Sequence, residues 1–244
     1  METYEVTEKM YEGKTKILFE TNDPKVALMR YKDDITAGNG EKHDLMENKA
    51  KLNCTISKKL FEHLTSTEKV AHHYIGMPNN MEMIVKKVKI FPVEVVLRNI
   101  SAGSFCKRYG IESGRKFQTP VLELFYKDDS LNDPLCSDTV VHELGWAMPH
   151  ELQEMKRQAW IVHKEMTEYW EKHHLTLVDA KYEFGMDKGG NIMLADELTL
   201  DSCRLWDNDG KSLDKDVFRK GESTANVKSA YQFVHDTINA DPIV

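Results

Sequence analysis

Charged and apolar residues alternate along the segment TLVDAKYEFGM at 176–186. Side chains on a β-strand point alternately to opposite faces, so Asp179, Lys181 and Glu183 are expected on one face. The apolar residues between them are expected to be buried on the other face: Val178, Ala180, Tyr182 and Phe184. Two carboxylates beside a lysine can bind a divalent cation and hold an anionic group next to it. The segment therefore predicts a metal or phosphate site on a strand.

The sequence DKGGN that follows predicts a tight hairpin to the strand-like segment IMLADELT, because Gly189 and Gly190 can adopt positive φ angles. If these glycines are the two central turn residues, Glu183 lies directly across from Asp196. A three-residue turn is expected to bring Glu197 opposite Glu183 instead. In either register, two carboxylates face each other.

Opposed carboxylates destabilise a sheet unless a cation lies between them. Magnesium prefers carboxylate and phosphate oxygens as ligands, so Glu183 and Asp196 are expected to hold the Mg²⁺ of a bound nucleotide. The alternative is that Lys181 simply pairs with these carboxylates on a solvated hairpin face. Spacing alone leaves both interpretations open.

A second phosphate signal lies at YEGKTK, residues 11–16. Gly13 is expected in a turn, with Lys14 and Lys16 on one face of the following strand, like a glycine loop that covers phosphates. The segment is not a Walker A motif, because Glu8 stands where that motif has its first glycine. A solvated turn is the alternative.

Two further segments could bind anions. TAGNG at 36–40 contains two glycines, but His43 occupies the position of the third glycine of a dinucleotide fingerprint. In RNISAGS at 98–104, Arg98 ends a strand and Ser104 is expected to be a helix N-cap, next to exposed amides that suit an anion. An ordinary capped turn is equally compatible with this segment.

Composition narrows the classes of function. The 244 residues carry a net charge of −7, which argues against a broad nucleic-acid surface and implies that any cluster of cations is local. Lys127, Arg204 and Arg219 could join such a cluster, although surface exposure is the usual place for these residue types.

Other chemistries find no support in the sequence. No apolar run approaches the roughly 20 residues of a membrane span, and the N-terminus resembles no targeting signal, so a cytoplasmic location is expected. The four cysteines form no CxxC pair and are expected to be reduced. HExxH, GxSxG, HRD and DFG motifs are absent from the sequence.

The elements expected to position these residues are mixed. Residues 4–31 read as short strands, and strand-like segments follow at 70–75, 82–90, 93–100 and 120–126. Apolar residues at every fourth position predict a helix over 48–64, and a 3,4 spacing predicts the longest helix from Pro149 to His174. Without strict alternation of strands and helices, the fold class is α+β.

Taken together, YEGKTK, TAGNG, PVEVVLRNISAGS at 92–104, LVDAKYEFG at 177–185 and ADELTLDSCRLWD at 195–207 closely resemble the SAICAR synthetase family. The resemblance implies a β-rich, kinase- or ATP-grasp-like nucleotide-binding domain over 1–87. It also implies a larger α+β domain over 88–244 that binds substrates and metal, with the active site between the two. The implied enzyme is an ATP-dependent ligase of de novo purine biosynthesis. It joins L-aspartate to carboxyaminoimidazole ribonucleotide (CAIR) through an acyl phosphate, giving SAICAR, ADP and phosphate.

The resemblance also implies roles for individual residues. For ATP these are Lys14, Lys16, Lys127, Glu82 and Ile84, the last two at the adenine. For magnesium they are Glu183 and Asp196. For CAIR or aspartate they are Arg98, Ser104, Asp133, Asp179, Lys181, Arg204 and Arg219, with Lys181, Asp179 and Lys127 as the expected catalytic residues.

Some expectations rest on family likeness alone. A homodimer is one. A monofunctional, bacterial-type enzyme is another, since the chain has no room for the fused carboxylase domain of animal members. Asn39 stands where some members have aspartate, which leaves the contacts of that loop open. The rival functions are a small-molecule kinase that shares the Mg–ATP site and a nucleotide-binding module without turnover.

Overall fold

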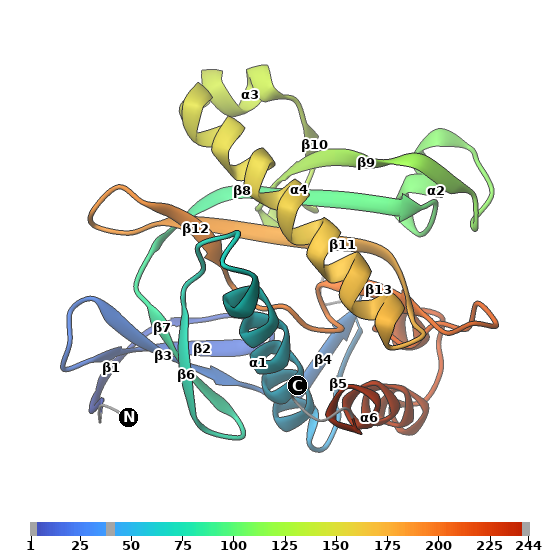
Figure 1. The fold of residues 1–244 in the computed structure, drawn as a ribbon, viewed down its shortest axis with the longest axis horizontal. Coiled ribbons are helices and arrows are strands. Elements are labelled where there is room, and N and C mark those ends of the chain that lie inside the picture. The colour runs from blue at the N-terminus through green and yellow to red at the C-terminus, as the bar shows by residue number, and fades with distance from the viewer. Residues whose placement is uncertain (1–3, 38–41, 241–244) are drawn as a thin grey trace.

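The computed structural model describes residues 4–37 and 42–240, which form two antiparallel sheets with helices packed against them (Figure 1). The first sheet has the order β1-β2-β3-β7-β6. Its strands are β1 (Val6–Glu12), β2 (Lys16–Thr21), β3 (Val26–Tyr31), β7 (Glu82–Lys86) and β6 (Tyr74–Asn79). A separate two-stranded ribbon consists of β4 (Asp34–Ala37) and β5 (Lys42–Leu45).

The second sheet is built around β11. On one side its order is β10-β9-β8-β11, and on the other side β11 pairs with β13 near its start and with β12 near its end. The strands are β8 (Lys89–Ile100), β9 (Lys116–Tyr126), β10 (Leu135–Cys136), β11 (Thr176–Met186), β12 (Ile192–Ala195) and β13 (Cys203–Trp206). The segment 196–202 therefore leaves the sheet between β12 and β13, beside the middle of β11.

Two long helices cover these sheets. Helix α1 (Lys49–Thr67) packs against β3, β6 and β7, and α4 (Pro149–Lys172) lies across β8, β11 and β12 (Figure 1). Both helices confirm the predictions from periodicity: Leu52, Ile56, Leu60 and Leu64 of α1 are all buried, as are Leu152, Met155, Ala159, Val162 and Met166 of α4. Pro149 is the first residue of α4, as expected.

The remaining helices are short or lie at the C-terminus. Helix α6 (Thr224–Ala240) packs on α1. The others are α2 (Ser104–Tyr109), the 3₁₀ turn η2 (Asp129–Leu131), α3 (Asp138–Glu143) and α5 (Asp216–Arg219). No helix in the described ranges is long and apolar enough to span a membrane.

Backbone hydrogen bonds connect the two sheets. His73 N–H donates to the carbonyl of Leu194, and Leu194 N–H donates to the carbonyl of Ala71, at 2.9 Å each. Residues 70–73 form only an isolated bridge and β6 runs from Tyr74 to Asn79, so the strand predicted over 70–75 exists but starts and ends four residues later than predicted. One continuous apolar core contains residues of both sheets, α1, α4 and α6. The α+β class is confirmed, while the boundary near Lys87 stays a prediction.

Candidate active site

The polar face of β11 is the centre of the site. Asp179 and Glu183 are buried and Lys181 is half-buried between them, and the three side chains bind partners on the neighbouring strands. Alternation therefore holds from Asp179 onward. The predicted alternation of faces fails at Val178, which packs with Ile100 rather than in the main core. The cause is a register shift in the pairing of β11 with β13 between residues 177 and 179.

The hairpin register differs from both predicted registers. Glu183 lies opposite Ala195, and the turn between Asp187 and Asn191 has three residues. Asp196 directly follows β12 with a φ of 61°, in the left-handed region, so it departs from the strand. The carboxylate that does lie across from Glu183 is Glu94, on the other side of β11 in β8.

Three lysines separate the carboxylates of this region. Lys181 donates to Glu94 at 2.6 Å and to Glu183 at 2.8 Å. Lys127, directly after β9, also pairs with Glu183. Lys16, the first residue of β2 in the other sheet, pairs with Asp196 at 2.5 Å and with Glu197 at 3.2 Å. We call these residues the lysine cluster: Lys16, Lys127, Lys181, Glu94, Glu183, Asp196 and Glu197.

Electrostatics fix the charge states in the lysine cluster. Burial by itself would lower the pKa of Lys16, but Asp196 and Glu197 outweigh it and raise that pKa. Burial would raise the pKa of Asp196, but Lys16, Lys127 and Lys181 together hold it well below its usual range. Burial raises the pKa of Glu94 despite its bond to Lys181. The cluster thus presents ionised Asp196 between charged lysines.

A second set of charges continues along the same face from Asp179. Its carboxylate accepts from Arg98 Nη1 at 2.6 Å and from Arg204 Nη1 at 2.8 Å. Asp216 joins Arg204 to Arg219 at 2.7 and 2.6 Å. Glu123 of β9 joins Arg98 to Arg108, both at 2.7 Å. We call this row the arginine ladder: Arg108, Glu123, Arg98, Asp179, Arg204, Asp216 and Arg219.

The turn before α2 lies against the arginine ladder. Gly103 has a φ of 57°, and a Cβ on it would stand 2.3 Å from Nη2 of Arg204. Gly103 is also the N-cap, and Ser104 is the first residue of α2, so the predicted N-cap at Ser104 is wrong by one residue. The exposed Ser104 hydroxyl accepts a 3.4 Å hydrogen bond from Arg108.

The glycine turn reaches across to the second sheet. Gly13 N–H donates to the carbonyl of Lys16, which closes the hairpin between β1 and β2. Lys14 precedes β2 and pairs with Asp129 of η2 at 2.6 Å, whereas Lys16 lies within β2 and enters the lysine cluster. The expectation that both lysines share one strand face is therefore wrong. Asp133, after η2, accepts from the backbone N–H of Asp128 and lies close enough to Glu94 to help raise its pKa.

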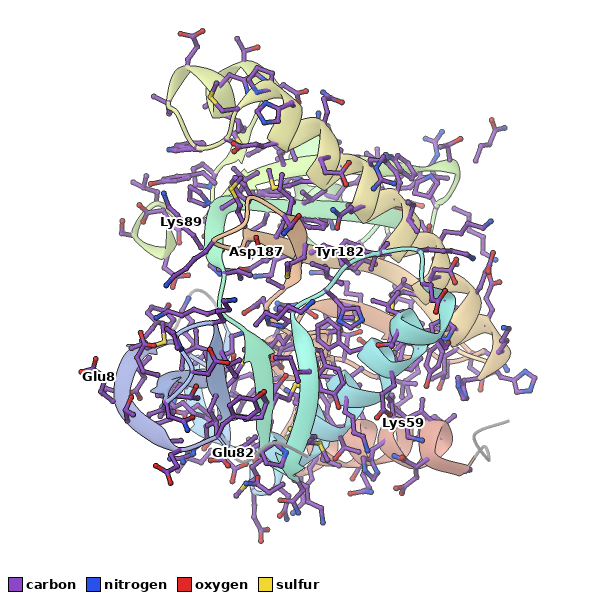
Figure 2. The ribbon with its side chains drawn as sticks, turned by 60° about the vertical axis from the view of Figure 1, so that its left-hand side comes forward. Glu8, Lys59, Glu82, Lys89, Tyr182 and Asp187 are labelled. Atoms are coloured by element: carbon purple, nitrogen blue, oxygen red, sulfur yellow. The ribbon has the colours of Figure 1, made fainter. Side chains whose placement is uncertain are left out.

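The two residues predicted at the adenine lie in the first sheet. Figure 2 shows Glu82 at the far end of that sheet from Tyr182 and Asp187, which belong to the second sheet. Glu82 pairs with Arg30 at 2.6 Å, and Ile84 packs with Val26 and Leu28. Neither contacts the lysine cluster, and their role stays a prediction. Most of the TAGNG loop lies outside the described residues.

Sequence reasoning missed several members of these networks. The sequence does contain a signal for Glu94 and Glu123, because each is a charged residue within an otherwise apolar strand. Charged residues are rarely buried without a partner, so such a position indicates a functional or paired charge. Glu197 follows Asp196 directly, and the sequence predicts it only as an alternative to Asp196 opposite Glu183. Arg108 and Asp216 carry no local signal, since a charged residue on a short helix is ordinary.

The acidic residues of the lysine cluster suit magnesium as partial ligands. No group of three or more potential ligands gathers in metal-binding geometry among residues 4–37 and 42–240. Mg²⁺ commonly takes only one or two carboxylates and completes its shell with phosphates and water. Glu197 Oε2 is buried without a hydrogen-bond partner in the described structure, which adds unsatisfied negative charge beside Asp196.

Comparisons with known proteins identify the family of the chain. The family model described as SAICAR synthetase matches residues 9–237. The chain is 43% identical over 231 residues to the phosphoribosylaminoimidazole-succinocarboxamide synthase of Streptococcus sanguinis, covering 95% of this chain and 97% of that protein. It is 46% identical over 224 residues to the synthase of Finegoldia magna, covering 91% and 96%.

Solved structures give the same result. The crystal structure of the synthase from Ehrlichia chaffeensis superposes with a TM-score of 0.91 at 38% identity, covering 96% of this chain and all of that one. A SAICAR synthetase solved in complex with ADP superposes with a TM-score of 0.88 at 37% identity, covering 96% and 99%. Sequence and fold together show that the chain belongs to the SAICAR synthetase family.

Proposed function

We propose that this chain is the ATP-dependent ligase that joins L-aspartate to CAIR, giving SAICAR, ADP and phosphate in purine biosynthesis. The observation that carries the proposal is the polar face of β11, where the lysine cluster continues directly into the arginine ladder. A phosphoryl donor and a carboxylate acceptor both need cations, and here the two sets of cations meet at Lys181 and Asp179. Membership in the SAICAR synthetase family supports the same reaction.

The lysine cluster is the proposed site for the ATP phosphates. Three lysines against four carboxylates leave it with one net negative charge if all are ionised. A triphosphate would be repelled by that balance unless a dication entered with it, which is why we assign Glu183 and Asp196 to Mg²⁺. When bound, magnesium neutralises the phosphate charge that grows during transfer. We assign Lys16 and Lys127 to contacts with the phosphates, with Lys14 at the edge.

The arginine ladder is the proposed site for the anionic groups of CAIR and aspartate. A guanidinium presents its donors in a planar fork that matches phosphate and carboxylate oxygens. Arg98, Arg204 and Arg219 are held by carboxylates that orient them before substrate arrives. Ser104 borders the ladder at Arg108, whereas Asp133 lies near Glu94 of the lysine cluster, and we assign both to substrate.

Chemistry at the junction follows from the substrates. A carboxylate is a poor electrophile, so the CAIR carboxylate first takes the γ-phosphoryl group of ATP to form an acyl phosphate. The amine of aspartate then attacks the acyl carbon and phosphate leaves. We assign Lys181 to stabilising the carboxylate and its phosphorylated form, and its place between Asp179 and Glu183 on one strand face supports that role. Asp179 keeps the two arginines beside it aligned.

Other features of the proposal rest on family likeness. We assign the adenine to the strand β7 at Glu82 and Ile84. We also propose the division into a nucleotide-binding domain over 1–87 and a substrate- and metal-binding domain over 88–244, together with a homodimer in the cytoplasm.

The decisive experiment is substrate-dependent ADP release. We expect ADP to form only when CAIR, aspartate, ATP and Mg²⁺ are all present, and to stop when EDTA removes the metal. ¹⁸O placed in the CAIR carboxylate should appear in the released phosphate. Equal ADP release without aspartate would favour a small-molecule kinase instead, and unlabelled phosphate would exclude the acyl phosphate.

Asp196→Asn separates an enzyme from a nucleotide-binding module. We expect turnover to fall by orders of magnitude while the circular dichroism spectrum stays that of the unmodified protein. Asp187→Asn, on the exposed turn of the same hairpin, is the matched control and should keep full turnover. A chain that binds Mg–ATP but never turns over would contradict the proposal.

A further inference from the structure

Lys215 is a buried cation for which the described chain provides no carboxylate partner. Its exposed fraction is 9%, yet no carboxylate oxygen of the described residues lies within 4.0 Å of its Nζ. Among residues 4–37 and 42–240, Nζ forms a single hydrogen bond, a long one of 3.5 Å to the hydroxyl of Thr36 on β4. Removing an ammonium from water without pairing it is costly. A ligand that supplies the missing charge would offset that cost.

Lys49 shows what a structural lysine looks like in this fold. It is fully buried, as the first residue of α1, and pairs with Asp201 at 2.5 Å. Asp201 also accepts from Asn53 and from the hydroxyl of Tyr231, so its carboxylate is already well used. Lys215 feels Asp201 from further away and does not share this pair.

The surroundings of Lys215 are mixed in charge. Asp201 and Glu197 attract its ammonium, while Lys49 and Arg219 repel it, and burial outweighs these four and lowers the pKa of Lys215. The adjacent Asp214 offers no help, because its carboxylate accepts from Leu205 N–H, the hydroxyl of Ser212 and Asp216 N–H.

The position of Lys215 connects it to the proposed site. It lies directly before Asp216, the carboxylate that joins Arg204 to Arg219 in the arginine ladder. On its other side it lies within electrostatic reach of Glu197, a member of the lysine cluster whose Oε2 is buried and unpartnered in the described structure. The ammonium of Lys215 and the Oε2 atom of Glu197, neither of them fully paired in the described structure, therefore lie near each other beside the proposed site.

We propose that Lys215 binds a carboxylate of the incoming amino-dicarboxylate, with the Thr36 hydroxyl as a second donor and Glu197 as an acceptor for the amino group. The inference rests on the proposed function and extends it to a residue to which no role has been assigned. A single ammonium with one hydroxyl suits a singly charged carboxylate. A phosphate dianion is better matched by the forked guanidiniums of the ladder.

Lys215→Met tests this assignment, because methionine keeps an unbranched side chain without the charge. We expect the KM for aspartate to rise roughly ten- to hundredfold, while the KM values for ATP and CAIR and the kcat stay within about threefold. Lys211→Met, on the exposed part of the same loop, should leave all of these unchanged. Succinate, which carries the carboxylates without the amine, should raise the Tm of the unmodified protein but not that of Lys215→Met.

Thermal unfolding separates a binding role from a structural one. Loss of an unpaired buried charge should leave the Tm of Lys215→Met equal to that of the unmodified protein or above it. Lys49→Met, which strands Asp201, should unfold at a much lower temperature. If Lys215→Met unfolds as Lys49→Met does, Lys215 is a structural partner of Asp201 and the inference is wrong. Lys215→Gln repeats the comparison with a polar side chain.

Other outcomes are equally decisive. A rise in the KM for CAIR instead of aspartate would assign Lys215 to the phosphate of the ribonucleotide and overturn our choice of ligand. If Lys215→Met lowers kcat without raising the KM for aspartate, and Lys215→Arg does not restore kcat, then Lys215 accepts a proton rather than binding an anion, and the inference is wrong. Absence of aspartate-dependent turnover in the unmodified protein would count against the proposed function, whereas the succinate comparison would still test Lys215.

Discussion

The guanidinium of Arg204 lies against the backbone of Gly103, so closely that a methyl group at residue 103 would stand 2.7 Å from its Cζ. Arg204 is held there by Asp179 and Asp216 and has little freedom to withdraw. Gly103→Ala should therefore weaken CAIR binding and lower the free energy of unfolding by about 1–3 kcal/mol. Steady-state kinetics and urea unfolding measure the two effects.

Gly110 is the matched control for this substitution. It ends the same short helix with a φ of 62°, but no other described residue, its chain neighbours aside, has an atom within 4 Å of a Cβ built on it. Gly110→Ala should show only the backbone cost, about 1 kcal/mol, with normal KM values. If the two alanine variants behave alike, the approach of Arg204 has no functional consequence.

Lys14 and Lys16 should respond differently to removal of their charge. Lys16→Met strands the buried Asp196 and Glu197, so we expect the free energy of unfolding to fall by about 3–5 kcal/mol. Lys14 forms an exposed pair with Asp129, and Lys14→Met should cost no more than about 1 kcal/mol. Both variants should raise the KM for ATP. Equal destabilisation by the two substitutions would show that the lysine cluster is not buried as described.

Periodic patterns predicted the elements well but not their registers. The spacing that indicated α4 and the alternation from Asp179 to Glu183 are local properties of the chain, and both hold in the structure. The partner of Glu183 depends on turn length, and a shift of one residue placed Ala195 there instead of Asp196. Glu94 faces Glu183 from β8. A hairpin pattern predicts pairing only between strands that follow each other in sequence, so it could not predict this pair.

The arginine ladder marks the limit of prediction from sequence. Residue patterns single out Arg98, Asp179, Arg204 and Arg219 one at a time, but only the family resemblance assigns them to a common substrate site, since nothing in their spacing brings them together. Their convergence depends on which strands neighbour β11, which is a property of the whole sheet. Even there the resemblance did not identify Glu123 or Asp216, which orient the arginines without being expected to touch substrate.

His163 should make the protein less stable in acid. Its Nε2–H donates to Asn99 Oδ1 at 3.0 Å, because the amide nitrogen of Asn99 donates elsewhere. In the neutral imidazole, Nδ1 accepts from Tyr182 O–H, also at 3.0 Å. Burial lowers the pKa of His163 to about 4. The unfolded chain binds this proton near pH 6.5 and the folded chain does not, so the free energy of unfolding should fall as the pH drops from 6.5 to 4.

Urea unfolding at several pH values measures the contribution of His163. Between pH 6.5 and 4, His163 should lower the free energy of unfolding by roughly 1.4 kcal/mol for each unit by which the pH falls. His163→Gln should be less stable at pH 7 but should lose part of the pH dependence. His150→Gln, at an exposed position of α4, should keep all of it. An unchanged slope in His163→Gln would mean that His163 is not the group that titrates.

Glu123 should act as a positioning residue for Arg98. Its two carboxylate oxygens accept from Arg98 Nε and Arg108 Nη2, so it fixes the plane of the Arg98 guanidinium from the side opposite Asp179. Glu123→Gln keeps the shape but can satisfy only one of these donors as an acceptor. We expect the KM for CAIR to rise about tenfold with kcat nearly unchanged, since one charged hydrogen bond is weakened.

The exposed Glu112→Gln is the control for Glu123→Gln and should match the unmodified protein. A fall in kcat without a change in KM would instead place Glu123 at the reacting atoms, and normal kinetics would show that Asp179 alone is enough to orient Arg98.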